Sequence, residues 1–420
     1  MTVPAPALAP RTSHDDPNLM TDQDSHSDHH APRHGPLHGV RILDMTSVIM
    51  GPAATQILGD LGADVIKIEP PEGDSMRKVG PVRHPGMGPM YLQANRNKRS
   101  VMLDLKDPKD RERLIALAGV VDVVVSNIRP QALRRLGLNY ETLSRANPGV
   151  IFCCAVGYGS GGPQAGKAVY DDLMQAASGL SALFGQVDGA PRYAPINVCD
   201  RVVGLYLTIA ILAALQHRHA TGEGQEVEVP MFETMAQFVL QDHMGGGAFV
   251  PPLGDMGYKR LLSRTRGPYP TKDGHLCVVV YTDAHWRAFA EMVGMPDLMQ
   301  RDPRFKDMAT RVLHSDDMGR FLTEQMPRFT TSEWIAKLEA ADIPVSPVNG
   351  IADLFDDPHL QAVEMFSEVE HPTEGLLKVA RFPLKFDRSP ATVRRLAPGL
   401  GEHTDEVLQE LLGETPGPAA

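Results

Sequence analysis

The stretch GVRILDMTSVIMGPAATQILGDLGADVIKIE, residues 39–69, decides the fold of this 420-residue chain. It holds two short runs rich in β-branched residues, VRILDM (40–45) and ADVIKIE (63–69). Between them, ATQILGDLG (54–62) has the apolar spacing of a helix. Strands of nearly continuous apolar residues joined by a helix are typical of a parallel sheet that is covered on both faces. The sequence therefore predicts an α/β fold.

The same alternation continues beyond this stretch. Three further runs predict strands, namely SVMLDL (100–105), VDVVVSN (121–127) and VIFCCAV (150–156). Helices are expected over 107–119, as one long helix from about Asp172, and over 202–220, where TGEG (221–224) provides the exit. GQEVEVPMFETMAQF (224–238) predicts a strand that runs into a helix.

These elements predict a domain organisation. We expect a Rossmann-like large domain over 36–229, a smaller α+β domain over 230–340, and a return to the large domain with a C-terminal helix over 341–420. The smaller domain should hold a strand at 275–281 and helices near 284–293 and 331–342. Residues 1–35 contain almost no large apolar side chains and are expected to form a disordered tail. Translation could start at Met1 or Met20.

Composition excludes several classes of function. A formal net charge of -11 argues against a nucleic-acid partner, because phosphate binding needs a basic footprint. No apolar run is expected to reach the ~18 residues of a membrane span, and the N-terminus lacks a signal-peptide pattern, so we expect a cytoplasmic protein with no membrane partner. The cysteines are interpreted as buried thiols and the histidines of the tail as solvated residues, so no metal site is predicted. The four cysteines are Cys153, Cys154, Cys199 and Cys277.

GYGSGG (157–162) matches the letters of a dinucleotide-binding fingerprint. That fingerprint also requires a helix that opens at its last glycine. Here Pro163, Gln164 and Ala165 follow, and no helical pattern begins before about Asp172. We therefore interpret the segment as a glycine loop that borders a ligand, and not as a nicotinamide site.

Cationic side chains follow two of the predicted strands. Lys106 comes after one strand, and Arg129 and Arg135 come after another. Ligands of parallel sheets bind beyond the carboxyl ends of the strands, so these cations could serve a phosphorylated ligand. Solvated surface charge explains the same pattern equally well.

VYDDLMQAASG (169–179) places two aspartates before a helical pattern. Asp172 with Gln175 three residues later predicts a helix N-cap and its partner. Asp171 would then lie just outside the helix, beside Tyr170, free for another role.

Several motifs in order resemble the family III CoA-transferases, the CaiB/BaiF family that includes formyl-CoA:oxalate CoA-transferase. The resemblance covers about residues 36–413. It is carried by residues 39–74, NRNKRSVMLDLK (95–106), YDDLMQAASGL (170–180), HATGEGQEVEVPMFE (219–233) and APGLGEHTDEVL (397–408). It implies an interlocked homodimer with an acyl-CoA thioester and a small carboxylic acid as substrates, and no permanently bound cofactor.

The resemblance also implies site residues. The family's catalytic aspartate follows the aromatic residue of the YDxxxQA segment, which makes it Asp171 here. The implied contacts to coenzyme A are Val48, Ile49, Met50, Lys106, Asn127 and Arg135. Some relatives carry an arginine where this chain has Pro70, so no phosphate contact is carried over at that point. The glycines 245–247 are not in clear register with the family's glycine loop.

The expected activity is the transfer of coenzyme A from an acyl-CoA donor to a free acid, through an aspartyl anhydride and an aspartyl-CoA thioester on Asp171. Arg260, Arg264 and Arg266 could pair with a second carboxylate, which favours a donor such as succinyl-CoA. The alternative is an α-methylacyl-CoA racemase-like enzyme, but those relatives have a histidine where Tyr170 stands, and a phenol of pKa ~10 is a poor proton shuttle. Asp200 matches an acid found in both classes. A catalytically silent CoA-binding protein is a third possibility.

Overall fold

The computed structural model describes residues 35–415. The predicted disordered tail, apart from Gly35, lies outside the described residues. The chain begins its first strand at Arg41.

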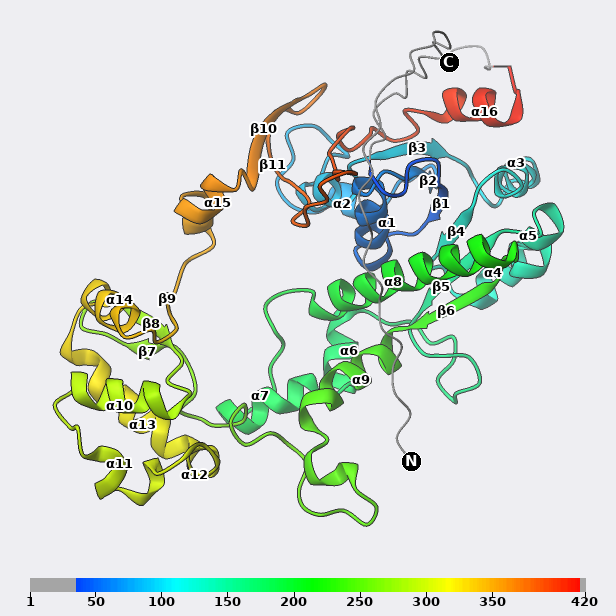
Figure 1. Cartoon of the computed structure of the whole chain (residues 1–420). Helices are drawn as coiled ribbons and strands as arrows, with labels where there is room; N and C mark the ends of the chain where they lie inside the picture. The colour runs from blue at the N-terminus through cyan, green and yellow to red at the C-terminus, as the bar shows by residue number, and fades with distance from the viewer. Residues whose placement is uncertain (1–34, 416–420) are drawn as a thin grey trace, which may run out of the picture. The chain divides into compact units, whose positions relative to one another are not determined.

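A six-stranded parallel sheet organises the larger part of the structure (Figure 1). Its order is β3-β2-β1-β4-β5-β6, and every neighbouring pair runs parallel. Its strands are β1 (Arg41–Met45), β2 (Asp64–Glu69), β3 (Lys98–Met102), β4 (Val123–Ser126), β5 (Ile151–Val156) and β6 (Glu226–Pro230). This is the predicted Rossmann-like sheet, and β3 alone is displaced, since it starts two residues before the expected Ser100.

The helices of this part follow or precede the strands in alternation. They are α1 (Met50–Asp60), α2 (Pro89–Ala94), α3 (Pro108–Ala118), α4 (Pro130–Leu136), α5 (Tyr140–Ala146), α6 (Asp171–Ala177), α7 (Leu180–Asp188), α8 (Val198–Thr221), α9 (Met231–His243) and α16 (Thr404–Leu412). The expected exit of α8 is confirmed, because Gly222 adopts a left-handed conformation with φ of 79°. The expected single long helix from Asp172 was wrong. Gly179, with φ of 89°, interrupts it and separates α6 from α7.

Alternation along each strand sends side chains to two apolar layers. Ile42 of β1 and Val125 of β4 pack with α1, α8 and α9 on one face. Leu43 and Val124 point the other way and pack with α3, α4, α5 and α16. Both faces of the sheet are therefore covered, as the continuous apolar strands predicted.

A smaller region has its own sheet and core. Its antiparallel sheet has the order β7-β8-β9, and two further strands, β10 and β11, form a separate hairpin. The chain leaves this region through α15 (Pro358–Ala362) and enters the hairpin of β10 (Phe366–His371) and β11 (Gly375–Ala380), which bonds to the larger part, since Arg96 Nη1 donates to the Ala380 carbonyl at 2.6 Å. The elements of the smaller region itself are β7 (Tyr269–Pro270), β8 (His275–Val278), α10 (Asp283–Met292), α11 (Leu298–Arg301), α12 (Met308–Leu313), α13 (Ser315–Gln325), α14 (Thr331–Ala340) and β9 (Val345–Pro347). Trp286, Phe289 and Trp334 are fully or almost fully buried at the centre of its core. The mixed α/β class is confirmed, while the domain boundaries at 230 and 340 stay predictions.

Helix α8 is long and apolar enough to cross a membrane by length and composition, contrary to the expectation that no such stretch exists. In the structure, Val203, Leu207 and Ile211 of this helix are completely buried in the core shared with the large sheet. Its apolar character is therefore explained, at least in part, by packing inside the protein.

Close packing of α8 on α1 generates a prediction. A Cβ atom added at the buried Gly204 would lie 2.9 Å from the carbonyl oxygen of Met50. Gly204→Ala should therefore cost about 1–3 kcal/mol of unfolding free energy, because backbone has to move to admit the methyl group. Urea unfolding measures the change. Gly254→Ala is the matched control, since a Cβ there meets nothing within 4 Å. Equal stabilities of the two variants would contradict the close approach.

Candidate active site

The order of the strands reverses at β1, which lies between β2 and β4. In open α/β sheets, ligands bind outside the carboxyl ends of the strands at such a switch point. The loop after β1 and the residue after β4 are joined there by a reciprocal pair of hydrogen bonds. The Ser47 amide donates to Asn127 Oδ1 at 3.0 Å, and Asn127 Nδ2 donates to the Ser47 carbonyl at 2.9 Å.

A cavity of about 270 Å³ opens at this edge of the sheet. Four residues implied by the family resemblance line it, namely Val48, Ile49, Met50 and Asn127. Tyr170 and Asp200 line it as well, although they lie far from these four in the sequence. The fold therefore brings the loop after β1 together with the ends of α6 and α8.

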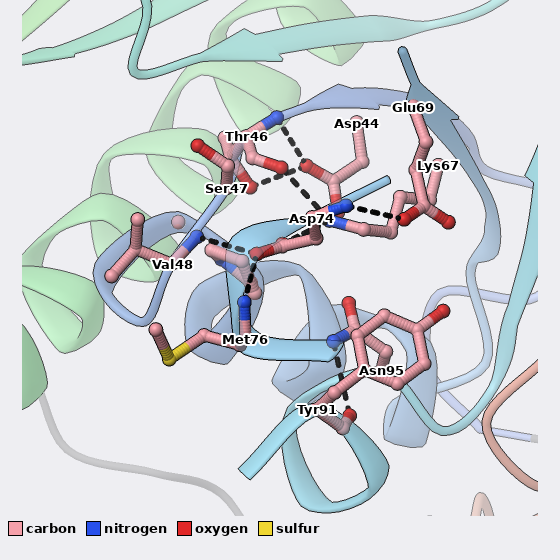
Figure 2. Close-up of polar contacts among 12 residues, drawn as sticks. Asp44, Thr46, Ser47, Val48, Lys67, Glu69, Asp74, Met76, Tyr91 and Asn95 are labelled. Atoms are coloured by element: carbon pink, nitrogen blue, oxygen red, sulfur yellow. Dashed lines mark hydrogen bonds and ion pairs between the residues drawn. The ribbon is translucent and has the colours of Figure 1, made fainter. Parts of the chain in front are cut away.

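Asp74 fixes the loop after β1 through a hydrogen bond to the backbone of Val48 (Figure 2). Val48 has φ of 72°, an unfavourable conformation for a β-branched residue. Its amide donates to Asp74 Oδ1 at 3.2 Å, and the Met76 amide donates to the same oxygen at 3.0 Å. Lys67 Nζ donates to Asp74 Oδ2 at 3.0 Å and to the Thr46 carbonyl at 2.8 Å. The strained loop is thus fixed by a buried ion pair.

A second buried ion pair lies beside the first. Lys98 Nζ is 3.0 Å from Asp44 Oδ2, and neither side chain is exposed. Burial opposes ionisation of Asp44, but Lys98, Lys67 and hydrogen bonds from Thr46 and Thr55 outweigh it and lower its pKa to about 2. Burial lowers the pKa of Lys98 to about 8, with Asp44 acting in the opposite direction. Asp44 therefore stays charged at neutral pH and anchors the start of the loop.

Asp171 is the first residue of α6, and Tyr170 occupies the N-cap position without a side-chain cap. The predicted cap at Asp172 was therefore wrong. Gln175 bonds to Asp171 and not to the residue three positions before it, since Gln175 Nε2 donates to Asp171 Oδ1 at 2.6 Å. Asp172 is exposed in the first turn of the helix.

Both carboxylate oxygens of Asp171 accept a hydrogen bond. Oδ1 accepts from Gln175, and Oδ2 accepts from the backbone amide of Asp200 at 3.0 Å, in the first turn of α8. Gln175 is held in turn, because its Oε1 accepts from the Ala194 amide at 2.8 Å. Asp171 is only 6% exposed. The carboxylate is therefore fixed in position and largely shielded from water.

Asp200 is a second carboxylate in the same place. Burial and the neighbouring charge of Asp171 raise its pKa from 3.8 to about 6, and Arg201 opposes this shift. Asp200 can hold a proton under mildly acidic conditions in which an ordinary aspartate cannot.

Of the three cationic residues predicted from the sequence, one lines the cavity and two do not. Arg129 lines the cavity, and Lys167, which the sequence did not single out, lines it as well. Lys106 lies in the turn between β3 and α3, and Arg135 lies in the last turn of α4. Both are exposed, and neither lines the cavity, so their contact with coenzyme A stays a prediction.

The glycine loop 157–162 borders the cavity through Gly157. Its amides bind carboxylates of the protein itself, since Gly159 N donates to Glu233 Oε1 at 2.9 Å and Ser160 N donates to Glu228 Oε1 at 2.8 Å. This arrangement does not leave those amides free for a phosphate. The glycines 245–247 begin a 3₁₀ turn after α9 and do not line this cavity.

Within residues 35–415 there is no group of three His, Cys, Asp or Glu side chains that could hold a metal ion. Three of the four cysteines are buried as expected, but Cys277 is exposed. Burial, together with the nearby charges of Asp171 and Asp200, raises the pKa of the Cys199 thiol to about 12. Cys199 is therefore unsuited to act as a thiolate beside the cavity.

The fold and the cavity define a doubly wound α/β protein. Its switch-point cavity is lined by Arg129 and Lys167, and also by Tyr170 and Asp200, which adjoin the immobilised Asp171. The chain belongs to CoA-transferase family III, whose family model matches residues 37–404. It is an acyl-CoA:carboxylate CoA-transferase.

Characterised relatives extend over most of the chain. Human succinyl-CoA:glutarate CoA-transferase is 33% identical over 380 residues, which cover 89% of this chain and 85% of the relative. Succinyl-CoA:mesaconate CoA-transferase of Haloarcula marismortui is 33% identical over 389 residues, with coverage of 88% and 95%. Among solved structures, a CaiB/BaiF family protein from Brucella suis matches with a TM-score of 0.77 at 30% identity, covering 90% of this chain and 100% of that one.

The buried ion pair between Lys67 and Asp74 predicts how a mutation changes the stability of the protein. Lys67→Met should lower the unfolding free energy by about 3–5 kcal/mol, because it leaves Asp74 buried without its cation. Lys109→Met is the control, since Lys109 is exposed on α3 and its loss should change stability by no more than about 0.5 kcal/mol. Urea unfolding at neutral pH compares them. A loss at Lys67 no larger than that at Lys109 would contradict the role of the pair.

The raised pKa of Asp200 predicts a dependence of stability on pH. Folding raises this pKa from 3.8 to about 6, so between these values the folded state keeps a proton that the unfolded state has released. The contribution of Asp200 is therefore most favourable below about pH 4 and is lost as the pH rises through 6. Asp200→Asn cannot ionise, so its stability relative to wild type should improve over this range by at most about 3 kcal/mol. Parallel pH profiles of the two proteins would refute the assignment.

Proposed function

We propose that the chain transfers coenzyme A through covalent intermediates on Asp171. The observation that carries this proposal is the state of that carboxylate, which is almost buried and has each oxygen held by one N–H donor. A fixed carboxylate at the edge of a cavity suits a nucleophile that has to meet a bound thioester in one orientation.

The reaction would begin with attack of an Asp171 oxygen on the acyl carbon of the donor. The C–S bond breaks, coenzyme A leaves as a thiolate, and a mixed anhydride forms. The thiolate then attacks the Asp171 carbonyl carbon, the anhydride C–O bond breaks, and the donor acid leaves. An aspartyl-CoA thioester remains. An acceptor carboxylate reverses the two steps and regenerates the Asp171 carboxylate.

Gln175 and the Asp200 amide would act in the steps that attack the Asp171 carbonyl carbon. Each such attack places negative charge on an oxygen of Asp171, and these are the oxygens that already accept the two N–H groups. Preorganised donors of this kind stabilise an oxyanion without reorganisation during the reaction. The near-complete burial of Asp171 would protect the anhydride and the thioester from water.

The coenzyme is proposed to lie along the loop after β1. Val48, Ile49 and Met50 give an apolar wall, and Arg129 and Lys167 give positive charge on the same cavity. Asn127 supports the wall, because both its amide oxygen and its amide nitrogen are bonded to Ser47. Lys106 and Arg135 are proposed as further contacts with the phosphates, beyond the cavity.

Succinyl-CoA is the proposed donor. The human and Haloarcula relatives are both named for succinyl-CoA, and an Agrobacterium fabrum relative, 32% identical over 380 residues, is named succinate–glutarate CoA-transferase. A C4 or C5 dicarboxylate is the proposed acceptor. Racemase chemistry is less favoured, because Tyr170 stands where the racemases have histidine.

An interlocked homodimer and a cytoplasmic location are retained as proposals. Leu205 and Ile209 of α8 support an association between chains, because both are more than half exposed although they are large and apolar. A second chain that packs against α8 would remove these side chains from water.

Two adjacent aspartates allow a sharp test of the nucleophile. Asp171→Asn should abolish transfer from succinyl-CoA to glutarate, because an amide does not form the anhydride. Asp172→Asn is the matched control and should retain most of the rate, since its side chain is exposed. Thermal unfolding of both variants checks that the fold is intact.

The covalent intermediate gives a direct readout. Wild-type protein incubated with succinyl-CoA alone and then with hydroxylamine should carry a hydroxamate on Asp171, located by peptide mass spectrometry. A hydroxamate on Asp172 or another carboxylate, with Asp171 unmodified, would overturn the mechanism.

A further inference from the structure

A second cavity, of about 260 Å³, lies in the smaller region. One wall is apolar and is formed by β8 and the residues after it, by α10 and by α13. Val278, Val280, Trp286 and Leu322 contribute to this wall. Ligand cavities typically combine such a wall with a few polar groups that fix orientation.

The polar side of this cavity is cationic. Arg260, Arg266 and Arg311 line it, whereas no aspartate or glutamate does. Arg311 is already neutralised, since its Nη2 donates to Asp283 Oδ1 at 2.5 Å and its Nη1 donates to the Phe305 carbonyl at 2.9 Å. Arg260 and Arg266 differ, because neither forms an ion pair with a residue in the described range 35–415.

Arg260 and Arg266 line the same cavity as two tyrosines, Tyr269 and Tyr281. Arg260 Cζ lies 5.8 Å from the centroid of the Tyr281 ring, which is itself part of the cavity lining. Burial raises the pKa of Tyr269, and the charges of Arg260 and Arg266 both oppose this shift. Tyr269 also lines the cavity.

We propose that this cavity binds a small carboxylic acid, with its carboxylate between Arg260 and Arg266 and its carbon chain against Val278, Val280 and Trp286. Guanidinium groups match a carboxylate in charge and in planar geometry. Arg266 is exposed and Arg260 is partly exposed, so both guanidinium groups are accessible to a ligand from solution.

This site goes beyond the proposed function, since its occupancy requires neither Asp171 nor an acyl-CoA. The acid could be the substrate of the transfer reaction or a separate effector, and both share the same chemistry. Arg264, predicted from the sequence together with the other two arginines, is exposed and does not line the cavity. It therefore provides a matched control within the same loop.

Cys277 supplies a readout that is independent of catalysis. It lines the cavity and is exposed, whereas the other three cysteines are buried. Hexanoate should slow its modification by the uncharged reagent N-ethylmaleimide, followed by peptide mass spectrometry, and hexan-1-ol should not. Arg260→Met and Arg266→Met should weaken this protection at least about tenfold, as expected for loss of a charged hydrogen-bond donor. Arg264→Met should leave it unchanged.

The proposal fails if hexanoate does not protect Cys277 in the wild type, if hexan-1-ol protects equally, or if Arg264→Met weakens protection as much as Arg266→Met. Thermal unfolding confirms that each variant is folded.

If protection depends on Arg260 and Arg266, the Michaelis constant for the acceptor acid identifies the source of the ligand. A raised constant in Arg266→Met with kcat retained assigns the cavity to the acid substrate, and an unchanged constant assigns it to an effector acid. Absence of transfer activity in the wild type would affect the proposed function alone, because the protection assay contains no acyl-CoA.

Discussion

The buried ion pair between Lys67 and Asp74 is the interaction on which the catalytic edge of the sheet depends. Both side chains are completely inaccessible to solvent, and burial of two charges is costly unless each finds further partners. Here Lys67 also reaches the Thr46 carbonyl, and Asp74 accepts from the amides of Val48 and Met76. Those additional bonds hold Val48 in a left-handed conformation that a β-branched residue otherwise avoids. The charge pair does not itself line the cavity, but it fixes the backbone of Val48, which does.

Two carboxylates, Asp171 and Asp200, lie in the same site but in different environments. Asp171 accepts N–H groups on both oxygens, whereas Asp200 is buried beside it and has a raised pKa. Two carboxyl groups with different environments can take different roles in one reaction. In the proposed reaction, the loop after β1 and the hydrogen-bonded Asp171 would together set the distance between a bound thioester and the carboxylate. Transfer of an acyl group to a carboxylate benefits from such positioning, because the nucleophile is weak.

The sequence was sufficient for the parallel sheet because its strands are buried on both faces and are therefore apolar along their whole length. The sequence was insufficient to predict hydrogen bonds where one side chain had two possible partners. Asp172 and Gln175 have the spacing of a cap, but Gln175 lies one helical turn from Asp171 and bonds to it instead. Lys67 lies within the apolar run ADVIKIE, and nothing in its spacing identifies Asp74 as its partner. Asp171 was identified from resemblance alone, and its hydrogen bonds required the fold. The break at Gly179 was missed because a helical pattern continues on both sides of it.

The protein has a formal net charge of -11 and is nevertheless proposed to bind an anionic ligand. Hydrogen bonds to the carboxylates near the site explain how both are possible. Three carboxylates near the switch point accept N–H donors, with Glu233 bonded to Gly159, Glu228 to Ser160, and Asp171 to Asp200 and Gln175. A fourth, Asp200, has a raised pKa. Arg129, by contrast, forms no ion pair within the described part of the chain, and it lines the cavity. A cleft with low-dielectric walls concentrates the field of such a cation. An acidic protein can therefore attract a phosphorylated thioester to one edge of its sheet while the rest of its surface repels it.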